Sequence, residues 1–274
     1  MSRRIRLGVC SWSLRARTPG ELAERVRAVG VDCLQLALDP LRTGAWPRAE
    51  TDAALHGLEI RSGMMGTAGE DYSTLATIRA TGGVRPDEHW EANRRAASAN
   101  AELARALGLE LVSFHAGFLP EERGAERAKL VARLREVVDR FAEHGVRAAF
   151  ETGQERAETL LAFLEELDRP AAGVNFDPAN MLLYDMGDPI EALDALAPWV
   201  RQIHVKDARR TQTRGAWGEE VTAGTGEVDW QAFFELLARR KIAVDLMIER
   251  EAGSDRIGDI RTARALVQRL WKQP

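Results

Sequence analysis

Short apolar runs alternate along the whole chain with longer segments in which apolar residues recur with a helical period. The short runs are rich in Val, Ile, Leu and Phe, and they end beside Gly, Pro or a charged residue, as buried strands commonly do. This pattern predicts eight strands, at residues 5–12, 33–38, 58–65, 111–115, 147–151, 173–177, 200–206 and 244–249.

The segments between these strands carry helix signals. Thr18 and Pro19 form a typical helix start, and Gly30 follows the last amphipathic residue, so these residues bound a first helix. Similar patterns predict further helices at residues 48–56, 86–107, 125–144, 155–167, 189–196, 230–239 and 257–271. Two segments rich in Gly and lacking a clear period, 66–83 and 211–228, are predicted to be long loops.

This alternation predicts an α/β fold, a single (β/α)8 TIM barrel with a parallel eight-stranded sheet. No change in composition marks a linker, so residues 1–274 are predicted to form one domain. The length of 274 residues is slightly above the roughly 250 residues typical of such barrels. A doubly wound open sheet is the alternative, because it uses the same alternation. Eight repeats within this length favour the closed barrel.

Composition narrows the class of protein. Hydrophobic residues make up 45% of the chain and charged residues 29%, as in globular proteins with a sizeable core. The net charge of −4 argues against a surface that follows a nucleic acid backbone. No apolar run approaches the ~18 residues of a membrane span, and the basic segment at residues 2–12 has too short an apolar stretch for a signal peptide. We therefore expect a cytoplasmic protein with neither nucleic acid nor membrane as a partner.

The two cysteines show no sign of metal binding or disulfide formation. Cys10 and Cys33 lie inside apolar runs and lack the spacing of metal-binding or disulfide-forming cysteines, so both are predicted to be small buried residues.

Four predicted strands in succession end in a potential metal ligand. These residues are Glu151, Asp177, His204 and Glu249, on the fifth to eighth strands. Active sites of such barrels lie at the carboxyl ends of the strands, so the four side chains are predicted to converge. Three carboxylates and one imidazole suit one divalent ion, Mn²⁺, Mg²⁺ or Co²⁺, with Zn²⁺ as a further candidate. Each residue alone could be a helix cap or a core residue, but four successive strand ends favour a metal site.

The same strand ends resemble a known family. The segments ETGQE, FDPANM, HVKD and IERE, with GTGEVDW between the last two and GVCSWSL near the start, resemble the xylose isomerase-like TIM barrel superfamily, most closely its sugar phosphate isomerase/epimerase members. The resemblance implies that Glu151 and Glu249 are catalytic, bind the metal and transfer a proton through an enediolate. Asp177 and His204 would complete the metal site, and the substrate would be a small carbohydrate or a derivative of one.

Four further residues are predicted to contact the substrate: His115, Asn180, Lys206 and Trp12. His115 ends the fourth predicted strand, Trp12 ends the first, and Lys206 should face the same way as His204 two residues before it. Asn180 could instead cap a helix, and Lys206 could instead form a salt bridge. Gln35, a polar residue inside the second strand, is predicted to contact Glu249 or the substrate.

Two positions differ from ketose 3-epimerases of this superfamily. Those enzymes often have a histidine where this chain has Asn180. They also have an arginine shortly after the position of His204, where the nearby residues of this chain are Lys206, Arg209 and Arg210. The particular isomerase or epimerase activity is therefore left open.

Other functions on the same scaffold are also considered. A dehydratase of the inosose or dehydroshikimate type is the main alternative, because it would use the same metal site and then expel a hydroxyl group. An abasic-site endonuclease is disfavoured, because that chemistry uses several zinc ions and more histidine ligands than a chain with five histidines offers. A metal-free binding protein is disfavoured because unused clustered carboxylates would repel each other. The sequence leaves open the substrate, its phosphorylation, the native metal and whether a homo-oligomer forms.

Overall fold

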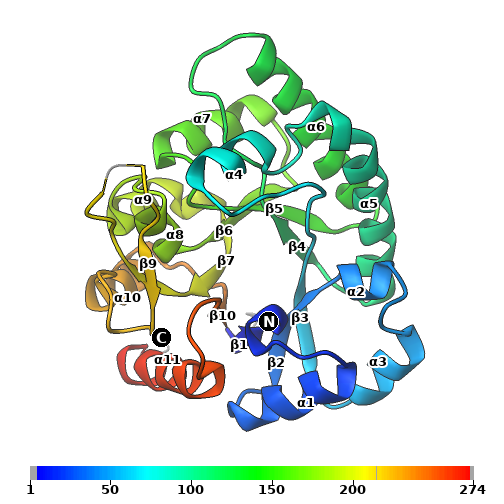
Figure 1. Ribbon diagram of the computed structural model, residues 1–274, viewed down its shortest axis with the longest axis vertical. Helices are drawn as coiled ribbons and strands as arrows, with labels where there is room; N and C mark the ends of the chain where they lie inside the picture. The colour runs from blue at the N-terminus through cyan, green and yellow to red at the C-terminus, as the bar shows by residue number, and fades with distance from the viewer. Residues whose placement is uncertain (1–4, 214, 272–274) are drawn as a thin grey trace.

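The computed structural model describes residues 5–213 and 215–271, whose strands close into a barrel (Figure 1). The strands are parallel and follow the order β1-β10-β7-β6-β5-β4-β3-β2, so β1 pairs with both β2 and β10. This closure confirms the predicted (β/α)8 barrel and excludes the open sheet. The barrel strands are β1 Leu7–Cys10, β2 Cys33–Ala37, β3 Glu59–Met64, β4 Leu111–Phe114, β5 Arg147–Glu151, β6 Ala172–Phe176, β7 Val200–Val205 and β10 Asp245–Ile248. Residues 2–4 of the basic segment considered above lie outside the described residues.

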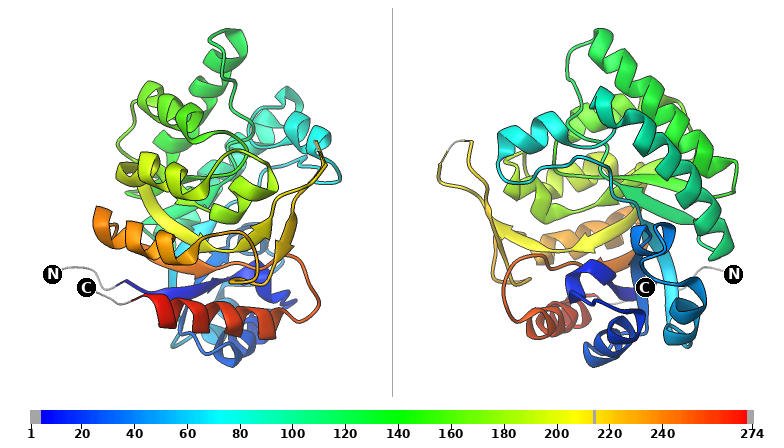
Figure 2. Two further views of the ribbon diagram at one scale, coloured as in Figure 1. Left: turned by 90° about the vertical axis from the view of Figure 1, so that its left-hand side faces the viewer. Right: turned by 45° about the vertical axis from the view of Figure 1, so that its right-hand side comes forward.

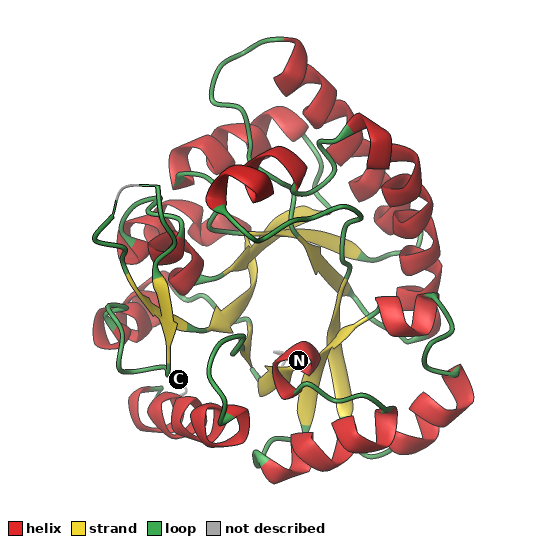
Figure 3. Cartoon of the chain, in the orientation of Figure 1, coloured by secondary structure: helices red, strands yellow, loops and turns green. Residues whose placement is uncertain are grey.

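Helices surround the ring of strands (Figure 3). They are η1 Ser11–Leu14, α1 Pro19–Ala28, α2 Asp39–Arg42, α3 Arg48–Ala54, α4 Leu75–Thr81, α5 Asp87–Ala106, α6 Ala125–Ala142, α7 Ala157–Leu167, α8 Pro178–Leu183, α9 Pro189–Leu196, η2 Ala197–Trp199, α10 Trp230–Arg240 and α11 Arg256–Leu270. Helix α1 begins as predicted, with Thr18 accepting a hydrogen bond from the Glu21 amide at 3.2 Å. Within the described part of the chain, no helix is both long enough and apolar enough to cross a bilayer.

The core lies inside the barrel and between the strands and the helices. All five residues of β6 are buried, because the barrel interior covers one face and helices cover the other. Phe114 of β4 and Phe150 of β5 meet edge to face at 5.4 Å, which links neighbouring strands. Full burial of one such large side chain contributes roughly 1.5–3 kcal/mol to folding.

The two predicted long loops contain short elements. Helix α4 lies within residues 66–83, so the loop prediction was wrong there. Thr74 and Thr77 form a reciprocal capping box at its start, but the helix is too short for a period to be visible in the sequence. Within 211–228, β9 Glu219–Val221 pairs antiparallel with β8 Asp207–Arg209. Two of its three residues are glutamates and all three are at least partly exposed, so no apolar run marked it.

The first strand is shorter than predicted. It ends at Cys10, and Ser11–Leu14 then turn into η1, so Trp12 lies on this short helix above the barrel and not at the strand end. Helix α4 and the β8–β9 ribbon lie on the same end of the barrel (Figure 2, left). This is the end to which the carboxyl ends of the strands point, where a (β/α)8 barrel holds its active site.

The GTGEVDW segment, residues 224–230, folds around the buried carboxylate of Asp207. Asp207 is fully buried and accepts hydrogen bonds from the Gly224 amide at 2.8 Å, the Gly226 amide at 3.2 Å and Trp230 Nε1 at 3.0 Å. A Cβ on Gly226 would lie 2.2 Å from Asp207 Oδ1, so only glycine allows this approach. The segment therefore wraps around the aspartate of HVKD and fixes the loop between β9 and α10.

Candidate metal centre

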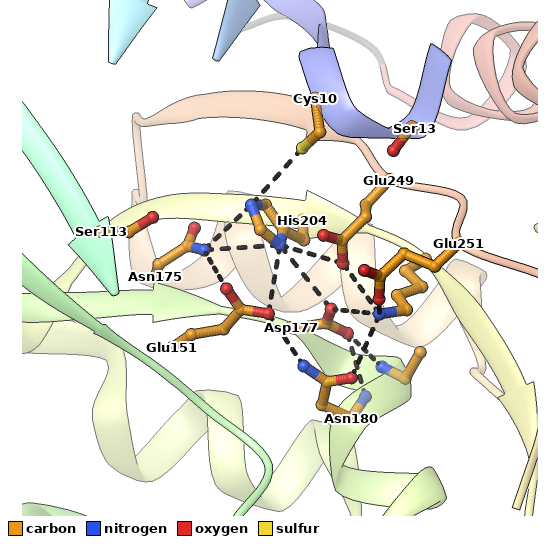
Figure 4. Close-up of polar contacts among 12 residues, drawn as sticks. Cys10, Ser13, Ser113, Glu151, Asn175, Asp177, Asn180, His204, Glu249 and Glu251 are labelled. Carbon is orange, nitrogen blue, oxygen red and sulfur yellow. Dashed lines mark hydrogen bonds and ion pairs between the residues drawn. The ribbon is translucent and has the colours of Figure 1, made fainter. Parts of the chain in front are cut away.

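The four predicted metal ligands come together at the carboxyl end of the barrel (Figure 4). Glu151 is the last residue of β5, His204 lies in β7, and Asp177 and Glu249 directly follow β6 and β10. One ligand atom from each lies within 4.8 Å of the others. All four are nearly completely buried, with exposed fractions between 0% and 4%. The structure thus brings these four side chains into one cluster, while their roles stay predictions.

His204 turns one ring nitrogen toward the carboxylates. Its Nδ1 lies 3.3 Å from Glu249 Oε2, 3.6 Å from Glu151 Oε1 and 3.7 Å from Asp177 Oδ2. Its Nε2 points the other way and lies 2.8 Å from Gln35 Oε1. The predicted contact of Gln35 with Glu249 was therefore wrong, because this side chain ends at His204. The alternative, a contact with the substrate, stays a prediction.

The two carboxylate oxygens of Asp177 have different surroundings. Oδ1 accepts hydrogen bonds from the amides of Ala179 at 2.8 Å and Asn180 at 3.0 Å, which caps α8. Oδ2 is buried and has no hydrogen-bond partner among the described residues, with His204 Nδ1 at 3.7 Å and Lys206 Nζ at 3.8 Å. A buried oxygen without a partner costs free energy, so this atom is free to bind a cation.

Both oxygens of Glu249 are held by donors. Trp12 Nε1 donates to Oε1 at 2.6 Å, and Lys206 Nζ donates to Oε2 at 2.9 Å. Lys206 also donates to Glu251 Oε2 at 2.7 Å, and the Glu251 side chain is 53% exposed. Trp12 and Lys206, predicted as substrate contacts, therefore orient a glutamate of the cluster.

Glu151 is held less completely. Asn180 Nδ2 donates to its Oε1 at 2.9 Å. Among the residues that the structure describes, the donors near its Oε2 are Asn175 Nδ2 at 3.5 Å and His115 Nε2 at 3.9 Å. The ring of His115 meets that of Tyr72 edge-on at 6.2 Å, which places Tyr72, 45% exposed, beside the cluster. Of the four carboxylate oxygens of Glu151 and Glu249, Oε2 of Glu151 thus has the most distant hydrogen-bond donors.

The positive charges of Lys206 and His204 favour the ionised form of the buried carboxylates around them. Burial favours a neutral Glu249, but Lys206 and His204 outweigh it, so its pKa lies well below the usual value. Burial raises the pKa of Asp177 to about 6, although Lys206 and His204 act in the opposite direction. Burial likewise opposes the charge on His204, yet the surrounding acids raise its pKa well above the usual value. At neutral pH the carboxylates are therefore ionised, which is the form that binds a metal ion.

These residues fit a divalent cation. The donors are three ionised carboxylates and one imidazole nitrogen on successive strand ends, and Asp177 Oδ2 lacks another partner. Glu151, Asp177, His204 and Glu249 would hold the ion, and an oxygen-rich set suits Mg²⁺, Mn²⁺ or Co²⁺.

Cys10 lies beside this cluster on its inner side. Its thiol is buried, 3.6 Å from His204 Nε2, and could share a metal with His204 and Glu249 by distance alone. Burial raises the pKa of this thiol to about 12, so without a metal ion it stays protonated near neutral pH. Both cysteines are free and buried, as predicted.

Three polar residues of the segments that end the strands were not identified from the sequence. Asn175 lies on β6 two residues before Asp177, and its side chain contacts His204 inside the barrel. The polar residue in VNFD could have revealed this position, because residues two apart in a strand face the same side. Glu251 follows Glu249 with the same spacing. Glu155 closes the ETGQE segment and is 8% exposed, yet it makes no hydrogen bond or ion pair within the described chain.

Glu155 predicts a pH dependence of stability. Burial raises its pKa from 4.5 to about 8, so the folded state holds a proton that the unfolded chain releases. This stabilisation is complete below about pH 4.5 and is lost as the pH rises through about 8. It amounts to several kcal/mol, at most about 5, since one pKa unit corresponds to about 1.4 kcal/mol.

The substitution Glu155→Gln should remove this dependence. Denaturant unfolding in EDTA at pH 5 and pH 9 would give a free energy of unfolding that falls more between the two for the wild type than for the variant. Parallel changes in the two proteins would contradict the assignment.

Comparison with known proteins agrees with this fold. Residues 23–270 match the family model described as xylose isomerase-like TIM barrel. The crystal structure of a xylose isomerase domain protein from Planctomyces limnophilus has a TM-score of 0.80 and 32% sequence identity, covering 90% of this chain and 92% of that one.

Two curated proteins are more distant relatives. A 3-oxo-isoapionate decarboxylase from Pectobacterium atrosepticum is 24% identical over 151 residues, 54% of each protein. A ketose 3-epimerase from Arthrobacter globiformis is 28% identical over 164 residues, 56% of this chain and 52% of that protein. The chain thus matches about half the length of these curated relatives.

Proposed function

The chain belongs to the xylose isomerase-like TIM barrel family, and we propose that it is a metal-dependent isomerase or epimerase of a sugar or sugar derivative. The observation that carries this proposal is the pair Glu151 and Glu249, whose carboxylate oxygens lie 3.6 and 3.3 Å from His204 Nδ1 within one buried cluster. Two carboxylates around one position can remove a proton from one side of a carbon and return it from another.

The bound ion would polarise a substrate carbonyl group and the neighbouring hydroxyl group, which acidifies the C–H bond between them. Glu151 is the better first base, because its Oε2 has only distant donors at 3.5 and 3.9 Å. Glu249, held by Trp12 and Lys206, would return the proton. Transfer between the two carboxylates through an enediolate gives an epimer or an isomer, depending on the carbon that receives the proton.

Burial supports this chemistry. His204 and Asp177 are 0% exposed and Lys206 is 3% exposed, so water has little access to the position between the carboxylates. Exclusion of water strengthens the electrostatic interactions that a developing negative charge needs. The names of the two curated relatives, an epimerase of a ketose and a decarboxylase of a 3-oxo compound, also describe reactions beside a carbonyl group.

A dehydratase is the second candidate, and the position of Lys206 favours it. Its ammonium group lies between Glu249 Oε2 and Glu251 Oε2, at 2.9 and 2.7 Å. A cation there could protonate a departing hydroxyl group after the same proton abstraction. The products distinguish the two reactions, because isomerisation conserves mass and dehydration loses one water molecule.

Solvent exchange tests the proposal. Purified protein incubated in D₂O with Mn²⁺, Mg²⁺ or Co²⁺ and a panel of keto sugars, inososes and 3-oxo sugar acids should introduce deuterium beside the carbonyl group of a substrate. Mass spectrometry and proton NMR would detect the label, and EDTA should prevent its incorporation. Metal-loaded protein that exchanges no proton of any such compound would contradict the proposal.

A further inference from the structure

We propose that Gln35 is a positioning residue that keeps a proton on Nε2 of His204 and so presents the Nδ1 lone pair to the metal. The inference rests on the metal site of the proposed function and adds a residue that does not itself touch the ion. The inference follows from the orientation of the buried side-chain amide of Gln35, which the neighbouring groups determine. Figure 4 shows His204 with three residues around it, Cys10, Ser113 and Asn175.

The neighbours of the Gln35 nitrogen fix the amide orientation. Nε2 of Gln35 lies 3.2 Å from the Gly63 carbonyl oxygen and 2.7 Å from Ser113 Oγ. A carbonyl oxygen only accepts hydrogen bonds, so the NH₂ end of the amide must face it. The Ser113 hydroxyl donates to Met64 Sδ at 3.0 Å, which leaves its oxygen free to accept from Gln35.

The oxygen end of the amide consequently faces His204. Gln35 Oε1 lies 2.8 Å from His204 Nε2 and accepts a second, weaker hydrogen bond from the Cys10 thiol at 3.5 Å. The amide is completely buried, and both donors and both acceptor positions are used. Reversing it would place its NH₂ group against the Cys10 thiol and its oxygen against the Gly63 carbonyl, so the orientation is strongly preferred.

The orientation of the Gln35 amide determines which ring nitrogen of His204 carries the proton. Because Gln35 Oε1 only accepts, Nε2 must carry the proton. An imidazole that binds a metal ion is neutral and has one N–H group, so with the proton kept on Nε2 the ion displaces the proton from Nδ1 and binds its lone pair. That nitrogen is the one that lies 3.3 to 3.7 Å from Glu249, Glu151 and Asp177.

Asn175 does not compete for this hydrogen bond. Its Nδ2 lies 3.0 Å from Nε2 and 3.4 Å from Nδ1 of His204, so it lies over the ring face and is not aligned with either nitrogen alone. Its Oδ1 accepts from Gln202 Nε2 at 3.2 Å, and Gln202 Oε1 in turn accepts from Ser62. Gln202 is thus a second buried glutamine of the barrel interior that makes no hydrogen bond to His204.

A hydrogen bond to the outer nitrogen of a metal-binding histidine fixes the ring and raises the affinity of the site, and its loss typically weakens metal binding about 10- to 100-fold. Gln35→Met should therefore lower Mn²⁺ affinity by about that factor. Gln35→Glu keeps an acceptor oxygen toward Nε2, whether it is ionised or protonated, and should restore the affinity to within about threefold of the wild type. Gln202→Met removes an equally buried glutamine and serves as the matched control, with affinity near that of the wild type.

The experiment combines metal titration of the four proteins with histidine ring ¹⁵N NMR of the wild type loaded with Zn²⁺. The expected spectrum has a proton on Nε2 of His204 and a metal-bound Nδ1, a signature that a merely structural role of Gln35 would not require. The NMR result stands even if Gln35→Met does not fold, which circular dichroism would reveal.

The outcomes separate this inference from the proposed function. Wild-type protein that binds no divalent ion would overturn both. Wild-type protein that binds the ion through Nε2, or a folded Gln35→Met variant that binds Mn²⁺ as tightly as the wild type, would overturn the role of Gln35 alone.

Discussion

Glu249→Gln and Glu151→Gln are each expected to lower kcat on the true substrate by about 10³-fold or more, while the barrel stays folded. Each change keeps the shape of the side chain and removes both a negative charge and a group able to accept a proton. General acid–base catalysis typically contributes about 10²- to 10⁴-fold, and loss of a metal ligand adds to this. Steady-state kinetics and circular dichroism of the two variants would measure the effect.

Glu251→Gln is the matched control for this prediction. Glu251 is also hydrogen-bonded to Lys206, but its side chain is 53% exposed and lies outside the group of metal-binding atoms. Its loss should change kcat by less than about tenfold, since it touches the cluster only through Lys206. Near-normal turnover by either Glu249→Gln or Glu151→Gln would refute the mechanism of paired glutamates.

Asp177→Asn should weaken divalent metal binding at least about 100-fold with little loss of stability. Oδ1 of Asp177 caps α8, whereas Oδ2 has no hydrogen-bond partner among the described residues. Asparagine keeps the capping oxygen and is as good a cap as aspartate, but its NH₂ group cannot bind a cation. Loss of an outer partner of a ligand already costs about 10- to 100-fold, so loss of the ligand itself should cost more. Elemental analysis after dialysis against metal would report the change.

The barrel was predictable because its signals are local and repeated. Each strand is an apolar run with a boundary residue, and helix α1 even begins at the predicted Thr18 and Pro19. Helix α4 and strand β9 were missed because one is too short for a period and the other is polar and partly exposed. Such elements form through contacts with distant parts of the chain, which no short window of sequence contains.

The candidate ligands were predictable because strand ends in a barrel meet at one place. The contacts among them were not, since Gln35 and His204 are distant in sequence and meet only through the barrel closure. The short helix η1 likewise places Trp12 against Glu249, which a strand ending at Trp12 did not suggest. The spacing of residues thus indicated where the site lies, while closure and loop conformation decide which atoms orient which.

Metal content decides whether Glu151, Asp177, His204 and Glu249 hold a divalent ion. Protein purified without chelators, and again after soaking in Mn²⁺, Co²⁺ or Zn²⁺ followed by dialysis, would be measured by elemental analysis beside Asp177→Asn. We expect about one divalent ion per wild-type chain, as one cluster of four ligands requires, and almost none in the variant. A wild-type protein that retains no divalent ion under any of these conditions, or a variant that retains as much as the wild type, would contradict it.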